Sequence, residues 1–304
     1  MDVKDYPKRP DISLDALDPN TSLALIARLV GHRRRVLDVG CASGYQARLL
    51  AENDCKTTGI EVNEQAAHLA REVCEQVHIA DIERSRVSEI VAGESYDVVV
   101  FGDVLEHLVN PLAVLEDVRN VLSPNGVVVA SIPNIAHGAI RLALLRGDFD
   151  YQPLGILDDT HVRFFTHKTL LELFAKAGFR IEELERTIVE IFSGSDLLPT
   201  LAPSEFSPDV IQRIEADPES RTLQFVFRAR PFRNDANAQV LALLETIAGL
   251  RSRISQLESE RRDLAQGDTS RNDESSAASR ADRIASLADR FRTFENITQN
   301  EDTT

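Results

Sequence analysis

Hydrophobic and polar positions follow two different periods between residue 35 and about residue 231. Short apolar runs of strand length occur at 35–39, 56–60, 76–80, 96–101, 126–132, 179–190 and 222–230. Segments with a helical spacing of apolar residues lie near 45–53, 64–74, 85–92, 109–122, 137–146 and 167–177. Strands that alternate with helices in this way predict a doubly wound, mainly parallel sheet, here with seven strands.

The last two strand candidates lack a clear helix between them. The stretch at 193–220 is instead rich in Pro and Ser, which predicts a late antiparallel hairpin carrying a long insertion. Ahead of the sheet, Asp18–Thr21 has the composition of a helix start, and the helix predicted over 22–30 ends at Gly31. We therefore expect a lead-in over 1–30 and a main domain over 31–231.

The pattern changes again from about Asn234. Apolar residues now alternate spacings of three and four, with Arg261 as the one interruption, which predicts a coiled coil over 234–266. The seven heptad positions are Val240, Leu243, Ile247, Leu250, Ile254, Leu257 and Leu264. We expect the chain to form a homo-oligomer, or to dock a partner, through 238–265. The alternative is that this segment is an amphipathic helix that packs on its own domain. Residues 267–304 are predicted to be a disordered linker and a short terminal helix.

Composition narrows the function classes. A net charge of −15 argues against general nucleic-acid binding, which favours a basic face. No apolar run approaches the roughly 20 residues of a membrane span, and no secretory leader is evident at the start of the sequence. The three cysteines lack metal-type spacing, so reduced thiols and a cytoplasmic location are expected.

The segment at 36–44 is the most informative part of the chain. It runs from a buried strand into a small-residue turn and then a helix start, an arrangement that presents unpaired backbone N–H groups to a ligand. Its glycines, Gly40 and Gly44, stand at the first and fifth positions of the turn, whereas a dinucleotide turn has the spacing Gly-x-Gly-x-x-Gly. Asp38 would repel a pyrophosphate and could accept a hydrogen bond from an ammonium group. A nicotinamide-dependent dehydrogenase is therefore disfavoured.

Acidic residues follow each of the next three strands. Glu61 can take the hydroxyls of a ribose, Asp81 can accept a hydrogen bond from an exocyclic amine, and Asp103 lies at the carboxyl edge of the sheet, where open α/β sheets bind ligands. A single acid of this kind is more often a solvated loop residue or a helix cap. Four acids at successive strand ends, counting Asp38, are not explained by capping alone.

On these residues, the chain resembles a class I S-adenosylmethionine-dependent methyltransferase over about residues 20–231. The resemblance implies a Rossmann-like fold and S-adenosylmethionine as cofactor. The positions it implies are Asp38, Gly40 and Gly44 for the methionine part, Glu61 for the ribose, and Asp81 with Ile82 for the adenine. Further cofactor-binding positions are expected at Cys41, Val62, Gly102 and Asp103. One departure is Ala42, which stands where the family has its middle glycine.

The acceptor side is expected after the fifth strand. Methyl transfer to oxygen needs alignment and a base near the incoming hydroxyl. We predict that His161 is this base, because an imidazole titrates near neutrality, and that Asp103 also belongs to the catalytic centre. The alternative is that His161 and Arg163 only anchor their loop. His137 is a further candidate.

Two finer resemblances suggest different acceptors. The segments at 131–134 and 160–165 resemble methyltransferases of sugar and polysaccharide assembly, which implies a sugar or glycan hydroxyl. Alternatively, Glu106, His107 and His161, with Asp103, resemble the metal-binding set of small-RNA 2′-O-methyltransferases, which implies a divalent metal that grips a vicinal diol. A metal is possible but not favoured. A third hypothesis is a non-catalytic, methyltransferase-like partner subunit that acts through the coiled coil.

Overall fold

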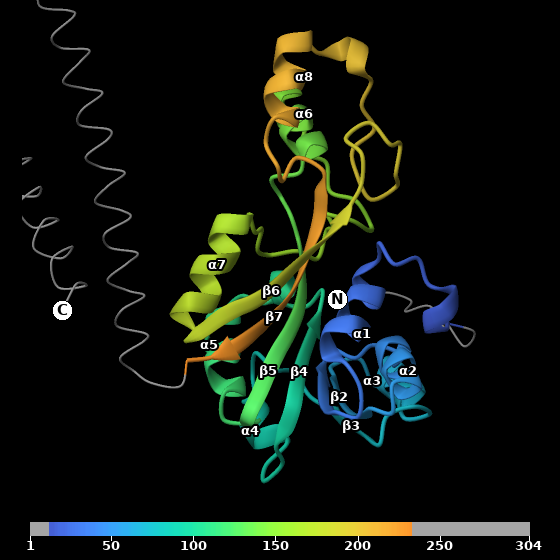
Figure 1. Ribbon diagram of the computed structural model, residues 1–304, viewed down its shortest axis with the longest axis vertical. Helices are drawn as coiled ribbons and strands as arrows, with labels where there is room; N and C mark the ends of the chain where they lie inside the picture. Colours follow the sequence, from blue (N-terminus) through green and yellow to red (C-terminus); the bar gives the residue numbers. More distant parts are fainter. Residues whose placement is uncertain (1–11, 233–304) are drawn as a thin grey trace, which may run out of the picture. The chain divides into compact units, whose positions relative to one another are not determined.

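The computed structural model describes residues 12–232. A sheet of seven strands forms its centre, as predicted, and its strand order is β3-β2-β1-β4-β5-β7-β6 (Figure 1). The strands are β1 (Arg35–Val39), β2 (Lys56–Glu61), β3 (Gln76–Ile79), β4 (Tyr96–Gly102), β5 (Leu122–Pro133), β6 (Phe179–Ile188) and β7 (Thr222–Pro231). Strands β1 to β5 pair in parallel, while β7 lies antiparallel between β5 and β6, which confirms the late hairpin.

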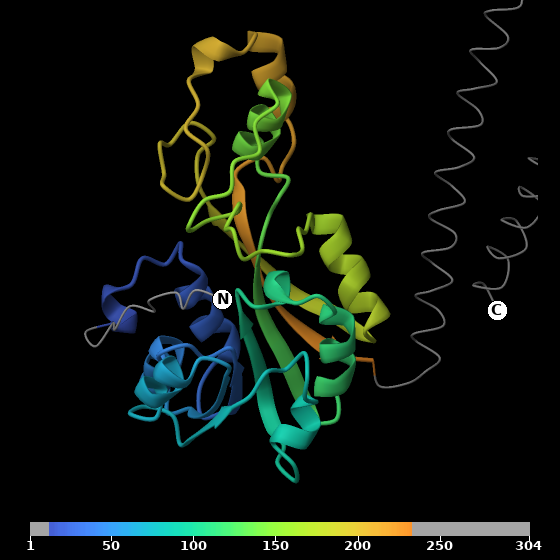
Figure 2. The same ribbon diagram turned by 180° about the vertical axis from the view of Figure 1, so that it is seen from behind.

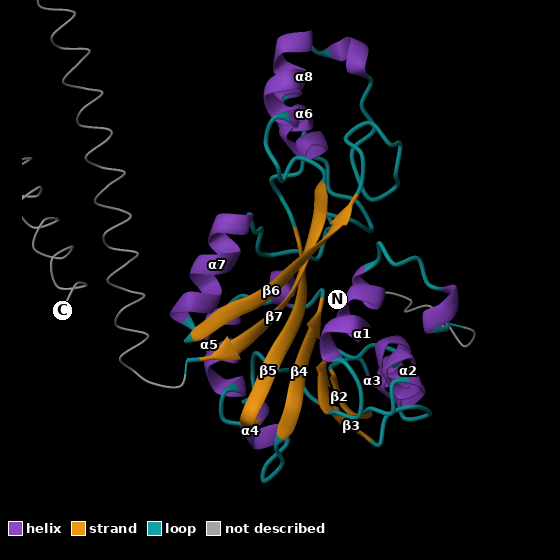
Figure 3. Cartoon of the chain, in the orientation of Figure 1, coloured by secondary structure: helices purple, strands orange, loops and turns teal. Residues whose placement is uncertain are grey.

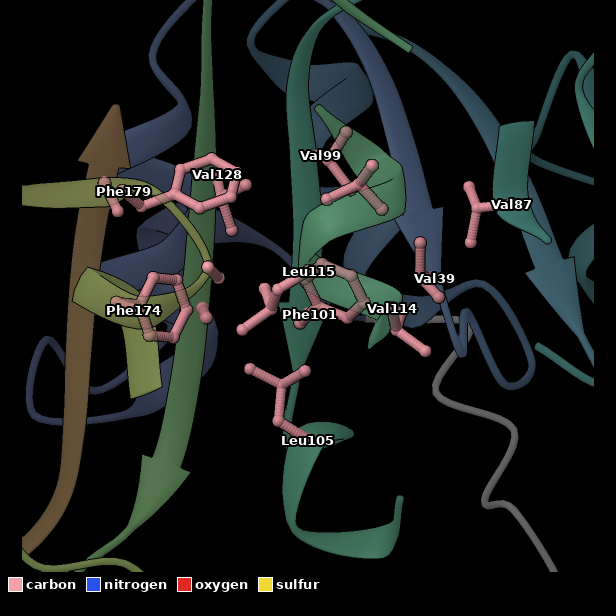
Figure 4. Packing of buried hydrophobic residues seen from close by; sticks show 14 of the residues in the cluster. Val39, Val87, Val99, Phe101, Leu105, Val114, Leu115, Val128, Phe174 and Phe179 are labelled. Atoms are coloured by element: carbon pink, nitrogen blue, oxygen red, sulfur yellow. The ribbon is translucent and has the colours of Figure 1, made fainter. Parts of the chain in front are cut away.

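Helices cover both faces of this sheet (Figures 1 and 2). On one face lie α1 (Ser22–Val30), α2 (Tyr45–Glu52) and α3 (Glu64–Ala70), and on the other lie α4 (Val87–Ile90), α5 (Pro111–Val118) and α7 (His167–Lys176). The larger core packs β4 and β5 against α5 and α7, with Phe101, Leu115 and Phe174 at its centre (Figure 4). Because both faces are buried, β4 and the second half of β5 at the centre of the sheet are apolar at nearly every position.

Strand β5 begins earlier than the sequence predicts. Residues 122–126 look like a turn, but Leu122 already pairs with Tyr96, and the next paired residues are Val98 and Val127. The four intervening residues of β5 are accommodated by this register shift, so the turn composition marks a bulge inside the strand rather than its start.

A small cap stands beyond the carboxyl end of β5 (Figure 3). It contains α6 (Gly138–Arg146), α8 (Pro208–Glu215) and the loops around them, and it has its own apolar core that includes Ile140, Ile191 and Ile214. Helix α8 lies within the insertion at 193–220, for which the sequence predicts no helix. Its eight residues give too short an apolar period for detection beside flanking Pro and Ser.

The predicted coiled coil over 234–266 and the segment 267–304 lie outside the described residues, as does the start of the lead-in over 1–11. Within residues 12–232, every helix is too short or too polar to cross a bilayer.

Candidate functional site

The turn between β1 and α2 needs glycine at both of its predicted positions. Gly40 and Gly44 have φ angles of +74° and +81°, in the left-handed region that glycine adopts without strain. A Cβ atom on Gly40 would lie 2.7 Å from Cγ2 of Val104, and one on Gly44 would lie 2.6 Å from Cγ2 of Val73. Ala42 between them also has a positive φ of +48°. The turn is therefore held close to β4 and α3 and has no room for side chains at its glycines.

This turn opens on a small pocket at the carboxyl edge of the sheet. Helix α1 covers the pocket from the lead-in side. Its lining residues are Ser22, Leu23, Ile26, Asp38, Gly40, Cys41, Tyr45, Gln46, Gly102 and Asp103. Five of the predicted cofactor residues are thus brought together, and α1 and α2 add lining that the turn motif does not indicate.

Two buried polar side chains in this pocket lack hydrogen-bond partners among residues 12–232. They are Asp38, through Oδ2, and Gln46, through both amide atoms. Burial, followed by the nearby Glu61 charge, raises the pKa of Asp38 to about 7. Unpaired buried polar groups are rare and costly, and they suit a ligand that brings its own donors and acceptors. An amino-acid end, with one ammonium and one carboxylate, fits these side chains.

Glu61 lies at the end of β2 and is buried. Its Oε2 accepts a hydrogen bond at 2.8 Å from the backbone N–H of Ala42, and its Oε1 accepts one at 2.8 Å from the N–H of Asn63. A carboxylate has about four acceptor sites, so two remain for hydroxyl groups. Val62 beside it is 64% exposed.

Asp81 follows β3 on the same edge and is only partly buried. Its Oδ1 accepts from the N–H of Glu83 at 2.9 Å, and its Oδ2 lies 3.2 Å from Nε of Arg84. Ile82 packs against the larger core. Asp81 therefore has partners within its own turn. Its contact with the adenine stays a prediction.

Asp103 has a left-handed backbone at the end of β4, with a φ of +54°. Its Oδ1 accepts hydrogen bonds from Oγ of Ser131 and Nε2 of Gln224, both at 2.8 Å. Burial raises the pKa of Asp103, and these two hydrogen bonds oppose that change. A left-handed aspartate beside a pocket is a form of strain found at functional sites. The sequence gives no signal for Gln224, which lies 121 residues away on β7.

A second cluster borders Asp103 on the acceptor side. The short 3-10 helix Leu105–His107 presents Glu106 and His107, and the loop at 158–165 presents His161. The backbone carbonyl of Glu106 accepts hydrogen bonds from the N–H groups of Val162 and Arg163, at 3.0 and 2.9 Å, which holds this loop in place. The imidazoles of His107 and His161 meet edge to face, with ring centroids 4.7 Å apart.

The three side chains of this cluster could hold a metal ion. One ligand atom from each of Glu106, His107 and His161 lies within 4.8 Å of the others. The Glu106 side chain is 1% exposed, and burial raises its pKa well above its usual range, with the neighbouring Asp103 adding to the rise. The predicted metal candidates are therefore brought together in space.

Two other candidates have structural contacts. His137 caps α6: its Nδ1 accepts from the N–H of Ala139 at 3.1 Å, and its Nε2 lies 3.0 Å from the carbonyl oxygen of Val189. The guanidinium of Arg163 donates to the carbonyl oxygen of Val109. His137 therefore joins α6 to the end of β6, and Arg163 anchors its loop, as the alternative interpretation for that residue expects.

The comparison with known proteins identifies the family of this domain. Residues 17–184 match the family model described as a methyltransferase domain. Over 148 residues the chain is 30% identical to the ubiquinone biosynthesis O-methyltransferase of Cereibacter sphaeroides strain KD131, a match that covers 47% of this chain and 59% of that relative. The enzyme of the same name from Actinobacillus pleuropneumoniae serotype 7 is 24% identical over 159 residues, which cover 50% of this chain and 68% of that relative.

Among solved structures, a SAM-dependent methyltransferase from Archaeoglobus fulgidus is similar at 21% identity, with a TM-score of 0.48, over 69% of this chain and 94% of that one. The match to the Cereibacter sphaeroides O-methyltransferase covers 59% of that relative's own length.

The family match covers more than half of the chain and contains the glycine turn, the acids after β2, β3 and β4, and the Glu106 cluster. The chain belongs to the methyltransferase-domain family, and its domain is that of an S-adenosylmethionine-dependent methyltransferase.

Proposed function

We propose that this chain transfers a methyl group to a hydroxyl oxygen. The observation that carries the proposal is the adjacency of two groups of residues: Asp103 lines the pocket of the glycine turn, and Glu106 and His107, which follow it closely in the chain, cluster with His161. An acceptor seated at the cluster would lie beside the donor pocket. The names of the relatives, which are O-methyltransferases, support an oxygen acceptor.

The donor pocket supplies the binding groups. S-adenosylmethionine, when bound, provides a methyl group on a sulfonium. We assign its ammonium to Asp38 and its carboxylate to Gln46, because these buried side chains lack other partners in the described chain. Glu61 with Val62 is assigned to the ribose, and Asp81 with Ile82 to the adenine. The pocket is also lined by Gly40, Cys41 and Gly102, and Gly44 is the residue before α2 at the end of the turn.

His161 is assigned to the activation of the acceptor. In the simplest form of the mechanism, the hydroxyl proton passes to His161 while the oxygen forms a bond to the methyl carbon and the carbon–sulfur bond breaks. We assign Asp103 to the same catalytic centre. Ser131 and Gln224 donate hydrogen bonds to its Oδ1, and its electrostatic interaction is with the neighbouring His107.

We propose a sugar or glycan hydroxyl as the acceptor. Aromatic side chains lie next to the cluster: Phe164 is 6.3 Å from the ring of His161, and Phe149 is 5.7 Å from Phe164, measured between ring centroids. Tyr151, which meets Phe149 edge to face, is 56% exposed. Exposed aromatic rings pack well against the C–H faces of sugar rings, as they do against other apolar surfaces.

The experiment is a transfer assay with a radiolabelled methyl donor and matched panels of sugar and phenolic acceptors. We expect label in a sugar ether. Label in phenols alone would move the acceptor to an aromatic class, and label on nitrogen alone would contradict O-methylation. The variant His161→Ala should lose turnover but retain the affinity for S-adenosylhomocysteine, whereas His68→Ala, at an exposed histidine on α3, should retain both.

Titration of the chain with S-adenosylmethionine tests the partner-subunit hypothesis. A failure to bind S-adenosylmethionine at millimolar concentration would exclude the enzyme hypothesis and leave the partner-subunit hypothesis.

We also propose self-association or partner docking through 238–265, supported by the heptad pattern alone. The variant Leu250→Lys should then lower the mass measured by light scattering. Cys41, Cys55 and Cys74 are free thiols, which supports a reducing, cytoplasmic location.

A further inference from the structure

Where β5 and β7 pair, one face of the two strands changes from apolar to polar. Val129 on β5 and Val226 on β7 pack in the same core as α1. Two residues further toward the carboxyl end of β5, the same rows hold Ser131 and Gln224. Residues two apart on a strand share a face, so both polar side chains stand where the rows are otherwise apolar. A polar side chain in such a row is costly unless it has a partner.

The partner that these two side chains share is the carboxylate of Asp103. Its Oδ1 accepts hydrogen bonds at 2.8 Å from Oγ of Ser131 and from Nε2 of Gln224. Oγ of Ser131, which is fully buried, also accepts one at 2.9 Å from the N–H of Asp103. Both side-chain hydrogen bonds are to Oδ1, and Oδ2 accepts none from residues 12–232. One carboxylate oxygen is therefore held by the sheet, and the other is left for the pocket that Asp103 lines.

Gln224 reaches Asp103 from a strand that does not pair with β4, because β5 lies between β4 and β7 (Figure 1). In the β6–β7 hairpin, Gln224 is the register partner of Thr187, which is 2% exposed. The N–H of Gln224 donates to Oγ1 of Thr187 at 3.1 Å, and this hydroxyl lies 3.5 Å from Oε1 of Gln224. The hairpin thus directs the amide oxygen toward Thr187 and the amide nitrogen toward Asp103.

We propose that Gln224 is a positioning residue for methyl transfer, and that it acts by holding the carboxylate of Asp103 at the donor pocket. Without this hydrogen bond, Oδ1 would have Ser131 as its one side-chain donor, and the carboxylate could rotate. A displacement of about 1 Å at a reacting centre can cost about a hundredfold in rate. The inference rests on the proposed place of Asp103 in the catalytic centre. Gln224 itself lies outside the residues that match the family model, 17–184.

The variant Gln224→Met tests the proposal, because methionine keeps the length of the side chain without its polar atoms. Methyl transfer from radiolabelled S-adenosylmethionine is measured in single turnovers, and isothermal titration gives the Kd for S-adenosylhomocysteine. We expect the rate constant to fall about tenfold or more and the Kd to change by less than about twofold. Gln212→Met, at an exposed glutamine on α8, is the matched control and should change neither.

A second pair of variants changes the same contact from β6. Thr187→Val removes the hydroxyl beside Gln224 and should lower the rate less than Gln224→Met does. Thr187→Ser keeps the hydroxyl and should retain the wild-type rate. Equal rates in Thr187→Val and Thr187→Ser would contradict an action of the hairpin through Gln224. This pair also gives the test if Gln224→Met fails to fold, which circular dichroism detects.

A double-mutant cycle separates positioning from a general structural role. If Gln224 acts through Asp103, then Gln224→Met should add less than about twofold to the loss of rate in Asp103→Ala. Losses that add fully, or a wild-type rate in Gln224→Met, overturn the inference.

The proposed O-methylation can fail without this inference. Transfer to nitrogen alone would contradict O-methylation, and the same variants would then be compared on the nitrogen acceptor. Crystal structures of the wild type and of Gln224→Met with S-adenosylhomocysteine need no acceptor at all. We expect the Asp103 carboxylate to leave its wild-type position in the variant, and an unmoved carboxylate overturns the positioning role whatever the acceptor.

Discussion

The Glu61 carboxylate at the end of β2 braces the glycine turn through the backbone of Ala42. Its Oε2 accepts a hydrogen bond from the backbone N–H of Ala42 at 2.8 Å, so the end of β2 is tied directly to the turn after β1. Ala42 has a left-handed φ of +48°, a conformation that costs an alanine roughly 1–2 kcal/mol and needs such support. The acid predicted to bind ribose therefore also holds the turn that admits the donor.

Substitution of Glu61 should weaken donor binding. In Glu61→Ala, the ribose loses its acceptor and Ala42 loses its brace, so the Kd for S-adenosylhomocysteine should rise about tenfold or more, which is the scale of one hydrogen bond to a charged group. Isothermal titration measures this, with Glu64→Ala on exposed α3 as the matched control. An unchanged Kd would contradict the placement of the ribose.

Replacing Gln46 by an apolar residue should raise the stability of the chain and weaken donor binding. Neither atom of its buried amide has a hydrogen-bond partner within residues 12–232, which costs about 1–3 kcal/mol in the ligand-free chain. Gln46→Met keeps the side-chain length without the polar atoms. We expect a higher free energy of unfolding in urea but weaker binding of S-adenosylhomocysteine, whereas Gln65→Met on the exposed side of α3 should change neither. Loss of stability in Gln46→Met would show that the amide has a structural partner.

Donor affinity should depend on pH through Asp38. Its pKa is about 7 in the ligand-free chain, and a bound ammonium would lower that value, so binding below pH 7 must displace a proton. The affinity for S-adenosylhomocysteine should therefore fall about tenfold from pH 8 to pH 6. Titrations in buffers of different ionisation enthalpy should detect the released proton. Asp38→Asn should remove this dependence, and a persistent slope in that variant would assign it to another group.

His137 should make the fold sensitive to acid. Burial lowers the pKa of His137 from its ordinary 6.5, so the unfolded chain binds this proton more readily than the folded chain. The stability contribution is complete above pH 6.5 and is lost as pH falls toward the lower, folded value. Protonation would also remove the Nδ1 acceptor that caps α6.

Urea unfolding between pH 7.5 and 5.5 measures this effect. His137→Asn retains a capping oxygen but does not titrate, so its stability should change less over that range than the stability of the wild type. His32→Asn, at an exposed position, should behave as the wild type does. Parallel pH profiles for all three chains would contradict the assignment.

The fold could be predicted because its signals are local. The helix expected over 22–30 and the strand expected over 35–39 have those bounds in the structure, since a cap residue, a glycine stop and a buried strand each act over a few residues. The glycine spacing and the acids after β2, β3 and β4 likewise indicate the donor, because the carboxyl ends of parallel strands meet at one edge. These features are set by the order of residues along the chain.

Only the tertiary structure brings distant residues into the site. The contact between Asp103 and Gln224 depends on β7 inserting between β5 and β6. Gln46 on α2 shares its pocket with residues of α1, where its buried amide finds no hydrogen-bond partner within residues 12–232. Likewise, the cluster of Glu106 with His161 forms because the loop at 158–165 binds the Glu106 carbonyl. Long-range pairing and burial decide these relationships, since they determine which polar groups lose water and which partners remain within reach.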